Sequence, residues 1–284
     1  GADVSISAAR FGTLPPLLQL SVSMAGVDGV IGNDFFMNSA VQIAPGFGSI
    51  EVVSDDVHEG LGAHYDAMFT DLYGQTIDAC TSRMVEFILS RWSHGSVLDV
   101  GAGTGRLTVP LAGSGVHVTA IEPASAMVSE LCRKKAAAQA DADVHLGGVL
   151  DVPLGNDAYD VVVMAFGVVD YIHDDEQLVK VFKALGASSA SDGVLLVQPT
   201  PEYFFESTIQ KGTDYTREHR LHRSGEKAII EHTVRFRGEI IDEERIMMKP
   251  RSKTSLAHLA LKAGWAMRET HVVDLYPMIE FAKT

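Results

Sequence analysis

The residues best suited to hold a ligand form a glycine-rich stretch, VLDVGAGTGRL, at residues 97–107. Gly101, Gly103 and Gly105 follow an apolar run with the length of a buried strand. Glycine lets the backbone approach a ligand closely, and the free N–H groups at the start of a following helix would face that ligand. The pattern therefore predicts a ligand-binding turn between a strand and a helix, as in proteins that bind dinucleotides or other adenosine compounds.

The spacing of the glycines and a neighbouring acid distinguish between these ligands. In a dinucleotide-binding turn the third glycine lies three residues after the second, a position that Arg106 occupies here. Asp99 lies two residues before the first glycine. A carboxylate there would repel a pyrophosphate but would orient the ammonium group of an amino acid. We therefore expect the ligand to be an aminoacyl nucleoside without phosphates.

Two further acids follow the next apolar runs. Glu122 ends the second of these runs, where a carboxylate can accept hydrogen bonds from both hydroxyls of a ribose, whichever adenosine cofactor is bound. Asp151 and Val152 follow the third run, where a carboxylate and a backbone N–H can bind an adenine edge. Together with the glycine turn, these acids predict an adenosine site along one edge of a sheet.

The elements that position these residues alternate along the chain. Residues 65–92 have apolar positions at helical spacing and predict two helices that are broken near Gly74. Asp174 and Gln177 are spaced as a capping box at the start of a later helix. Apolar strands interleaved with amphipathic helices predict a parallel sheet covered on both faces. The expected strands are 96–100, 117–121, 144–147, 159–165 and 193–198, and the expected helices are 106–112, 125–140 and 175–185.

The two flanks of this core have different patterns. Residues 1–58 are rich in glycine and serine and in β-branched residues, which predicts an arm or a small β-rich extension ahead of a core at 59–200. Residues 201–252 alternate apolar and polar positions over 215–222, 227–237 and 239–248, which predicts a three-stranded antiparallel meander. It would cover the site or form a dimer contact. Residues 253–284 then supply the last helix and strands of the core.

Composition narrows the partners. The 284 residues carry a formal net charge of −14, which argues against nucleic acid and anionic membranes and favours a neutral or cationic acceptor. Cys80 and Cys132 are expected to be reduced core residues of a cytoplasmic protein. The longest apolar run, 161–169, is too short to span a bilayer, and no signal peptide is expected. A homodimer is possible through the arm or the meander.

These motifs together resemble the class I S-adenosylmethionine-dependent methyltransferases. The resemblance covers about residues 59–200, and it implies an α/β fold with a Rossmann-like seven-stranded sheet and S-adenosylmethionine as cofactor. The tyrosine-bearing helix at residue 65, the sequence GRLTVPLA after the glycines and the β-rich insertion are similar to bacterial natural-product N-methyltransferases. The cofactor-binding positions that the resemblance implies are Tyr65, Asp99, Gly101, Ala102, Gly103, Gly105, Arg106, Glu122, Pro123, Met127, Asp151, Val152, Ala165, Phe166 and Gly167.

The catalytic candidates lie in the loop after the fourth strand. Asp170 would hold an acceptor ammonium and take its proton, Tyr171 would orient a lone pair, and His173 would act as a base. Each also has a structural alternative: a loop cap, a packed ring and a solvated residue, respectively. No metal site is expected, because His219 and His222 point to opposite faces of an extended strand.

The sequence thus favours N-methylation of an amine on a small molecule or peptide in natural-product biosynthesis. O- or C-methylation remains an alternative, because a hydroxyl or a carbon acid usually needs a base. A nicotinamide-dependent oxidoreductase is disfavoured by Asp99 and Arg106. A non-catalytic partner that binds S-adenosylmethionine would keep the same glycines.

Overall fold

The structure is a computed structural model that describes the backbone of residues 19–24, 27–31, 39–43 and 50–54, and then residues 58, 60–273 and 277–284 with their side chains, that of residue 203 excepted. The chain divides into two compact units, Gly1–Val57 and His58–Thr284. Each unit is described by itself.

The first unit contains a four-stranded sheet. Its strands are β1 (Gln19–Met24), β2 (Val27–Ile31), β3 (Ser39–Ile43) and β4 (Ile50–Ser54), in the spatial order β2-β1-β3-β4. β1 and β3 run parallel, whereas β1 with β2 and β3 with β4 run antiparallel. The short strands expected in this segment are therefore present.

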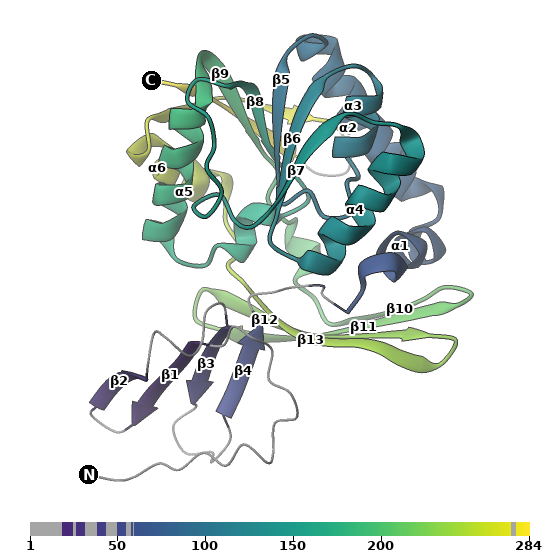
Figure 1. Ribbon diagram of the computed structural model, residues 1–284. Coiled ribbons are helices and arrows are strands. Elements are labelled where there is room, and N and C mark those ends of the chain that lie inside the picture. Colours follow the sequence, from purple (N-terminus) through teal and green to yellow (C-terminus); the bar gives the residue numbers. More distant parts are fainter. Residues whose placement is uncertain are drawn as a thin grey trace. The chain divides into compact units, whose positions relative to one another are not determined.

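The second unit is built on a seven-stranded sheet with the order β14-β15-β9-β8-β5-β6-β7. Strands β5 to β9 run parallel, and β15 runs antiparallel to β9 and β14. The predicted α/β fold with a seven-stranded sheet is confirmed (Figure 1). The strands are β5 (Ser96–Val100), β6 (His117–Glu122), β7 (Ala142–Leu146), β8 (Tyr159–Met164), β9 (Ser189–Val197), β14 (Trp265–Val272) and β15 (Pro277–Lys283).

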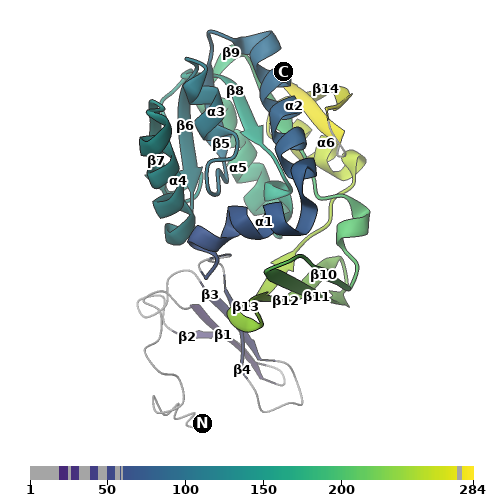
Figure 2. The same ribbon diagram turned by 90° about the vertical axis from the view of Figure 1, so that its right-hand side faces the viewer.

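Helices cover both faces of this sheet. α5 (Asp175–Ser188) and α6 (Lys253–Lys262) pack on one face, and α2 (Gln75–Trp92), α3 (Thr108–Gly113) and α4 (Ser125–Ala138) pack on the other (Figures 1 and 2). Apolar residues therefore point to both faces of the central strands, which explains why these strands read as unbroken apolar runs.

Helix boundaries follow local chemistry. Asp174 caps α5, because its carboxylate accepts the Gln177 N–H at 2.7 Å, as the sequence predicted. The helix after the glycines begins at Thr108 and not at residue 106. Gly105 has a φ of 82°, which a right-handed helix does not admit, so the turn continues through Leu107.

A second sheet follows β9. It comprises β10 (Thr208–Lys211), β11 (Tyr215–Ser224), β12 (Lys227–Phe236) and β13 (Glu239–Met248), in that spatial order and antiparallel throughout. We call this sheet the meander. The prediction of three strands was wrong by one, because β10 has only four residues, too few for an alternating pattern to be recognised.

Helix α1 (Tyr65–Tyr73) joins the meander to the core. It ends at Gly74, as expected. The Asp71 carboxylate of α1 accepts the backbone N–H groups of Thr213, Asp214 and Tyr215 at 2.8–2.9 Å. These hydrogen bonds, that from Tyr215 above all, lower the pKa of Asp71. The turn into β11 is therefore attached to α1 and lies beneath it (Figure 1).

Two remaining expectations concern single residues and membranes. Both cysteines are free, and Cys80 is buried as predicted, but the prediction that Cys132 is a core residue was wrong because it lies on the exposed side of α4. Among the described residues, no helix has the length and apolarity to cross a membrane.

Candidate functional site

The glycine turn lies where the sheet order reverses. β5 pairs with β6 on one side and with β8 on the other, and open α/β sheets bind ligands at the carboxyl end of such a switch point. Gly101, Gly103 and Gly105 have φ values of 67°, 56° and 82°. A Cβ added at Gly103 would meet no heavy atom within 4 Å. The backbone at Gly103 therefore borders open space in which a ligand can lie close to it.

Glu122 connects the end of β6 to this turn. Its Oε2 accepts the Gly103 N–H at 2.8 Å and its Oε1 accepts the Ala124 N–H at 2.9 Å. Both oxygens of the carboxylate are thus held at the carboxyl end of β6, beside the glycine turn. The arrangement fits the predicted role of this acid.

Asp99 and Asp151 are placed differently from each other. Asp99 is buried and accepts the Thr108 hydroxyl at 2.6 Å, and burial raises its pKa to about 6. Its side chain holds the glycine turn to the first turn of α3. Asp151 is exposed and accepts only a long hydrogen bond, 3.2 Å, from the N–H of Gly148. Its carboxylate lies at the surface, and its contact with an adenine amine stays a prediction.

Polar contacts of Asp66 attach helix α1 to the glycine turn. Asp66 accepts the Thr104 hydroxyl at 2.7 Å and the Lys134 ammonium at 2.6 Å. Tyr65, one residue earlier, has its pKa raised by burial, so its hydroxyl stays neutral. The side chains of α1 therefore form a wall of the site.

Two arginines and two phenylalanines form a series of cation–π contacts from the glycine turn towards the meander. The Arg106 guanidinium lies 4.7 Å from the Phe166 ring centre and 5.3 Å from that of Phe69. The Arg217 guanidinium of β11 lies 5.2 Å from the same Phe69 ring. The Arg106 charge thus lies against two rings, and its role in cofactor binding stays a prediction.

The loop after β8 carries the three catalytic candidates. Asp170 is fully buried, accepts the Thr200 N–H at 2.6 Å, and has a pKa raised to about 6 by burial. Tyr171 lies with its hydroxyl 3.4 Å from Nε2 of His58, and burial raises its pKa. His173 is half-buried, and burial lowers its pKa. Of the three, Tyr171 contacts the polar cluster described next, whereas Asp170 bonds the backbone that follows β9.

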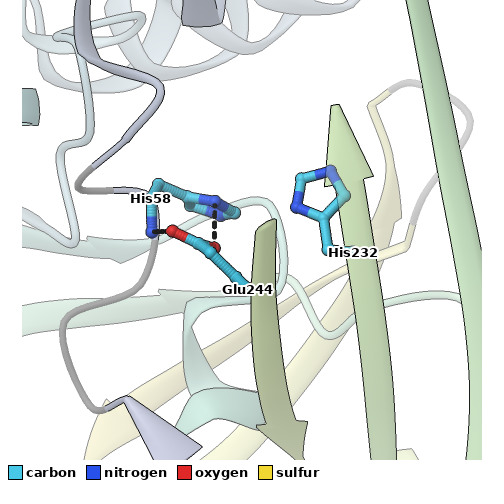
Figure 3. A group of neighbouring side chains, drawn as sticks. All are labelled: His58, His232 and Glu244. Carbon is cyan, nitrogen blue, oxygen red and sulfur yellow. Dashed lines mark hydrogen bonds and ion pairs between the residues drawn. The ribbon is translucent and has the colours of Figure 1, made fainter. Parts of the chain in front are cut away.

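A cluster of buried polar residues lies where α1, the loop after β8 and the meander meet. His58 contributes its backbone N–H to Glu244 Oε1 at 2.5 Å, and its Nδ1 lies 3.4 Å from Glu244 Oε2 (Figure 3). His232 points into the same space from β12 (Figure 3). The His219 and His232 ring centres lie 4.9 Å apart. We call His58, His219, His232, Asp242 and Glu244 the histidine–carboxylate cluster.

Charges within the cluster follow from burial and contact. Burial by itself raises the pKa of Glu244, but hydrogen bonding from His232 and His58 outweighs it and lowers that pKa to about 2. Burial lowers the pKa of His232 to about 4 and that of His219 to about 2. Burial, with the neighbouring acids, raises the pKa of Asp242 to about 7. At neutral pH the cluster thus contains an ionised Glu244 beside two neutral imidazoles.

The cluster also bears on metal binding. Ligand atoms of His58, His232 and Glu244 lie within 4.8 Å of one another, a group that the sequence did not predict. However, the Arg217 Nε–H donates to His232 Nε2 at 3.2 Å. Because that nitrogen accepts, the neutral His232 ring carries its proton on Nδ1, the nitrogen that faces the carboxylates. This tautomer and the adjacent guanidinium charge make the cluster a hydrogen-bonded network and a poor ligand set for a cation.

Sequence reasoning missed most of this cluster. Arg217, His219, His232 and Asp242 occupy positions of β11–β13 that alternate with exposed ones and are buried. Polar residues on the apolar face of an alternating strand were the available signal. The register that pairs His219 with His232 and His232 with Glu244 was not readable from the sequence.

The other predicted cofactor positions divide into two sets. Gly101, Ala102, Pro123, Val152, Ala165, Phe166 and Gly167 follow the carboxyl ends of β5 to β8. Met127 does not face this edge: it is 1% exposed and packs with Leu61, Met68, Tyr215 and Val234. Its long side chain fills the space between α4 and the meander.

The sheet order with the reversed β15, the glycine turn at the switch point and the acid after β6 define the class I S-adenosylmethionine-dependent methyltransferase fold. Residues 97–193 match a family model described as a methyltransferase domain.

Comparisons with known proteins support this assignment. An uncharacterized methyltransferase of Staphylococcus carnosus is 33% identical over 123 residues, which are 43% of this chain and 54% of that protein. A ubiquinone/menaquinone biosynthesis C-methyltransferase of Geotalea daltonii is 30% identical over 98 residues, 32% of this chain and 41% of that protein. The chain thus aligns with about half the length, or less, of these curated relatives.

Solved structures share the fold over more of the chain. The CcbJ methyltransferase of Streptomyces caelestis superposes with a TM-score of 0.68 at 20% identity and covers 81% of this chain and 99% of its own. DesVI of Streptomyces venezuelae gives a TM-score of 0.62 at 22% identity, with coverage of 78% and 97%. At these identities the superpositions establish a common fold.

Proposed function

We propose that the protein transfers a methyl group from S-adenosylmethionine to an amine of a small molecule or peptide. The observation that carries this proposal is Glu122, whose carboxylate bridges the end of β6 to the Gly103 N–H at the switch point. The open side of Gly103 and the exposed Asp151 carboxylate support the same adenosine site. Bound S-adenosylmethionine supplies an electrophilic methyl group.

The residues of this chain then have distinct tasks. Gly103 and Glu122 bind the nucleoside, and Asp151 orients its base. Tyr65 and Tyr171 are half-buried and neutral, so they limit the access of water and offer hydroxyl groups to the acceptor. Exclusion of water and fixed orientation are the main protein contributions to an in-line methyl transfer.

An amine acceptor is favoured by charge. Glu244 is ionised within the buried cluster, and the whole chain carries a net charge of −14. Solved proteins of the same fold include the sugar N-methyltransferase KedS8 and CalS10, an amino pentose methyltransferase of calicheamicin biosynthesis. A role in natural-product biosynthesis is part of the proposal. O-methylation is the second candidate, favoured by the imidazole that Glu244 contacts.

Calorimetric titration with S-adenosylhomocysteine tests the cofactor site. We expect Glu122→Ala to lose binding. The unaltered protein and Glu130→Ala should bind, because Glu130 pairs with Arg133 of the same helix, α4. Equal binding by all three proteins would contradict the assignment of Glu122.

A mass-spectrometric screen with trideuteromethyl-labelled donor tests the acceptor. Glucosamine, glycylglycine and tyramine present a sugar amine, a peptide amine, and an amine together with a phenol. Label on nitrogen supports the proposal. Label only on the tyramine oxygen or on carbon would overturn N-methylation and leave the methyltransferase assignment intact.

A further inference from the structure

His58 occupies a position that the catalytic candidates from the sequence do not explain. Its backbone has a φ of 72°, which is uncommon for a residue with a side chain and persists where surrounding contacts impose it. Glu244 supplies those contacts, because one of its oxygens accepts the His58 N–H and the other lies 3.4 Å from the ring Nδ1. A single carboxylate thus fixes both the backbone and the ring of His58.

The opposite nitrogen of the same ring faces the acceptor side of the site. The Nε2 atom of His58 lies 3.4 Å from the Tyr171 hydroxyl, and the rings of His58 and Tyr65 lie 5.4 Å apart. Because Tyr171 stays protonated, its hydroxyl donates and Nε2 accepts. Nδ1, which lies 3.4 Å from Glu244 Oε2, therefore carries the ring proton. Hydrogen bonds of a catalytic base are often this long before substrate binds.

We propose that His58 is the general base of the methyl transfer and that Glu244 is the positioning residue that orients its ring. This inference rests on the proposed function and adds the group that receives the acceptor's proton. The lone pair of the acceptor nitrogen or oxygen forms a bond to the methyl carbon, while the carbon–sulfur bond breaks and leaves its electron pair on sulfur. The proton of the acceptor passes to Nε2 of His58 and from there to water.

The neighbouring charges are consistent with this role. Glu244 is ionised and therefore stabilises the imidazolium that forms. Arg217 donates to Nε2 of His232 and to the Tyr73 hydroxyl, so its charge is held by those partners. Asp242 contacts His232, with 3.8 Å between Oδ2 and Nδ1. Among the residues that the structure describes, Glu244, His232, Tyr65 and Tyr171 contact His58.

The first test reads the tautomer directly and needs no acceptor. Protein labelled with ¹⁵N-histidine and saturated with S-adenosylhomocysteine is studied by long-range ¹H–¹⁵N NMR at pH 8, and His58→Gln assigns the signal. We expect the tautomer with its proton on Nδ1, and a mixture of tautomers in Glu244→Gln. A ring protonated on Nε2, or one that is unchanged in Glu244→Gln, would overturn the proposal. If His58→Gln fails to fold, the ring-preserving Tyr171→Phe assigns the signal instead.

The second test measures turnover between pH 6 and 9 with the three amines named above, each at saturation. His58→Gln should lower kcat by about 10²–10⁴-fold, the usual contribution of a general base, with the donor KM little changed. Glu244→Gln should lower kcat less and change the shape of the pH profile. The matched controls are His222→Gln and Glu231→Gln, an exposed histidine–carboxylate pair on the same meander, and both should retain activity. Unchanged kcat in His58→Gln would overturn the proposal.

Two further results separate the alternatives. If the purified protein contains stoichiometric zinc or manganese and His58→Gln does not, the cluster is a metal site, and the roles proposed for His58 and Glu244 are overturned. Absence of S-adenosylhomocysteine binding by the unaltered protein would overturn the proposed function itself, whereas binding together with the wrong tautomer would overturn only the role of His58.

Discussion

Gly101→Ala should destabilise the protein far more than the same change two residues later. Gly101 has a φ of 67°, and a left-handed backbone costs a residue with a side chain about 1–2 kcal/mol. A Cβ at Gly101 would also lie 2.5 Å and 2.9 Å from the two methyl carbons of Val168. Displacing that packed side chain costs roughly 1–3 kcal/mol more. We expect a total loss of about 2–5 kcal/mol, or roughly 5–15 °C in Tm.

Gly103 and Val168 supply the controls. Gly103 has a φ of 56° but no atom within 4 Å of an added Cβ, so Gly103→Ala should cost only the backbone contribution, about 1–2 kcal/mol. Val168→Ala removes the methyl groups that obstruct the new Cβ. In a double-mutant cycle, Val168→Ala should therefore recover about 1–3 kcal/mol in the Gly101→Ala background.

The assay is thermal and urea unfolding followed by circular dichroism, with S-adenosylhomocysteine titrated separately. Gly103→Ala should lose nucleoside binding although it stays folded, because its open side is where the ligand approaches. The reasoning is refuted if the two glycine variants lose equal stability, or if Val168→Ala is equally destabilising with and without the Gly101 change.

The remaining predictions concern titration and docking. Asp99→Asn should keep the Thr108 hydrogen bond. Because burial raises the pKa of Asp99 to about 6, the folded protein binds more protons than the unfolded protein between pH 4 and 6, and its stability falls as the pH rises through this window. Urea unfolding across the window should show that the variant lacks this fall of about 1–3 kcal/mol. His219→Leu should reduce the loss of stability at low pH. Burial lowers the pKa of His219 to about 2, so this histidine is uncharged in the folded protein but takes up a proton in the unfolded protein below about pH 6.5. If the Tm of the variant and of the unaltered protein depend on pH in the same way, this prediction is contradicted. Asp71→Ala should speed amide exchange at residues 213–215, whose N–H groups it accepts, and unchanged exchange there would show that the meander holds this turn unaided.

Local patterns in the sequence determined the core fold and the nucleoside half of the site. Unbroken apolar strands alternating with amphipathic helices allow few arrangements other than a covered parallel sheet, and the carboxyl ends of its strands meet at one edge. Glu122 is the last residue of β6, and Gly103 and Asp151 lie in the turns after β5 and β7, so their convergence was readable from their positions. Such sites are set by short-range spacing.

Only the tertiary structure decided the acceptor half. His58 lies 113 positions from Tyr171 and 186 positions from Glu244 along the chain, and no periodicity links them. The pairing of His232 with Glu244 depends on a β12–β13 register that a shift of one residue would reverse to the other face. Burial keeps His232 neutral and hydrogen bonds from the histidines keep Glu244 ionised, and both depend on how the meander packs. A base assembled from distant segments is therefore a property of packing, whereas the glycine turn is a property of the chain itself.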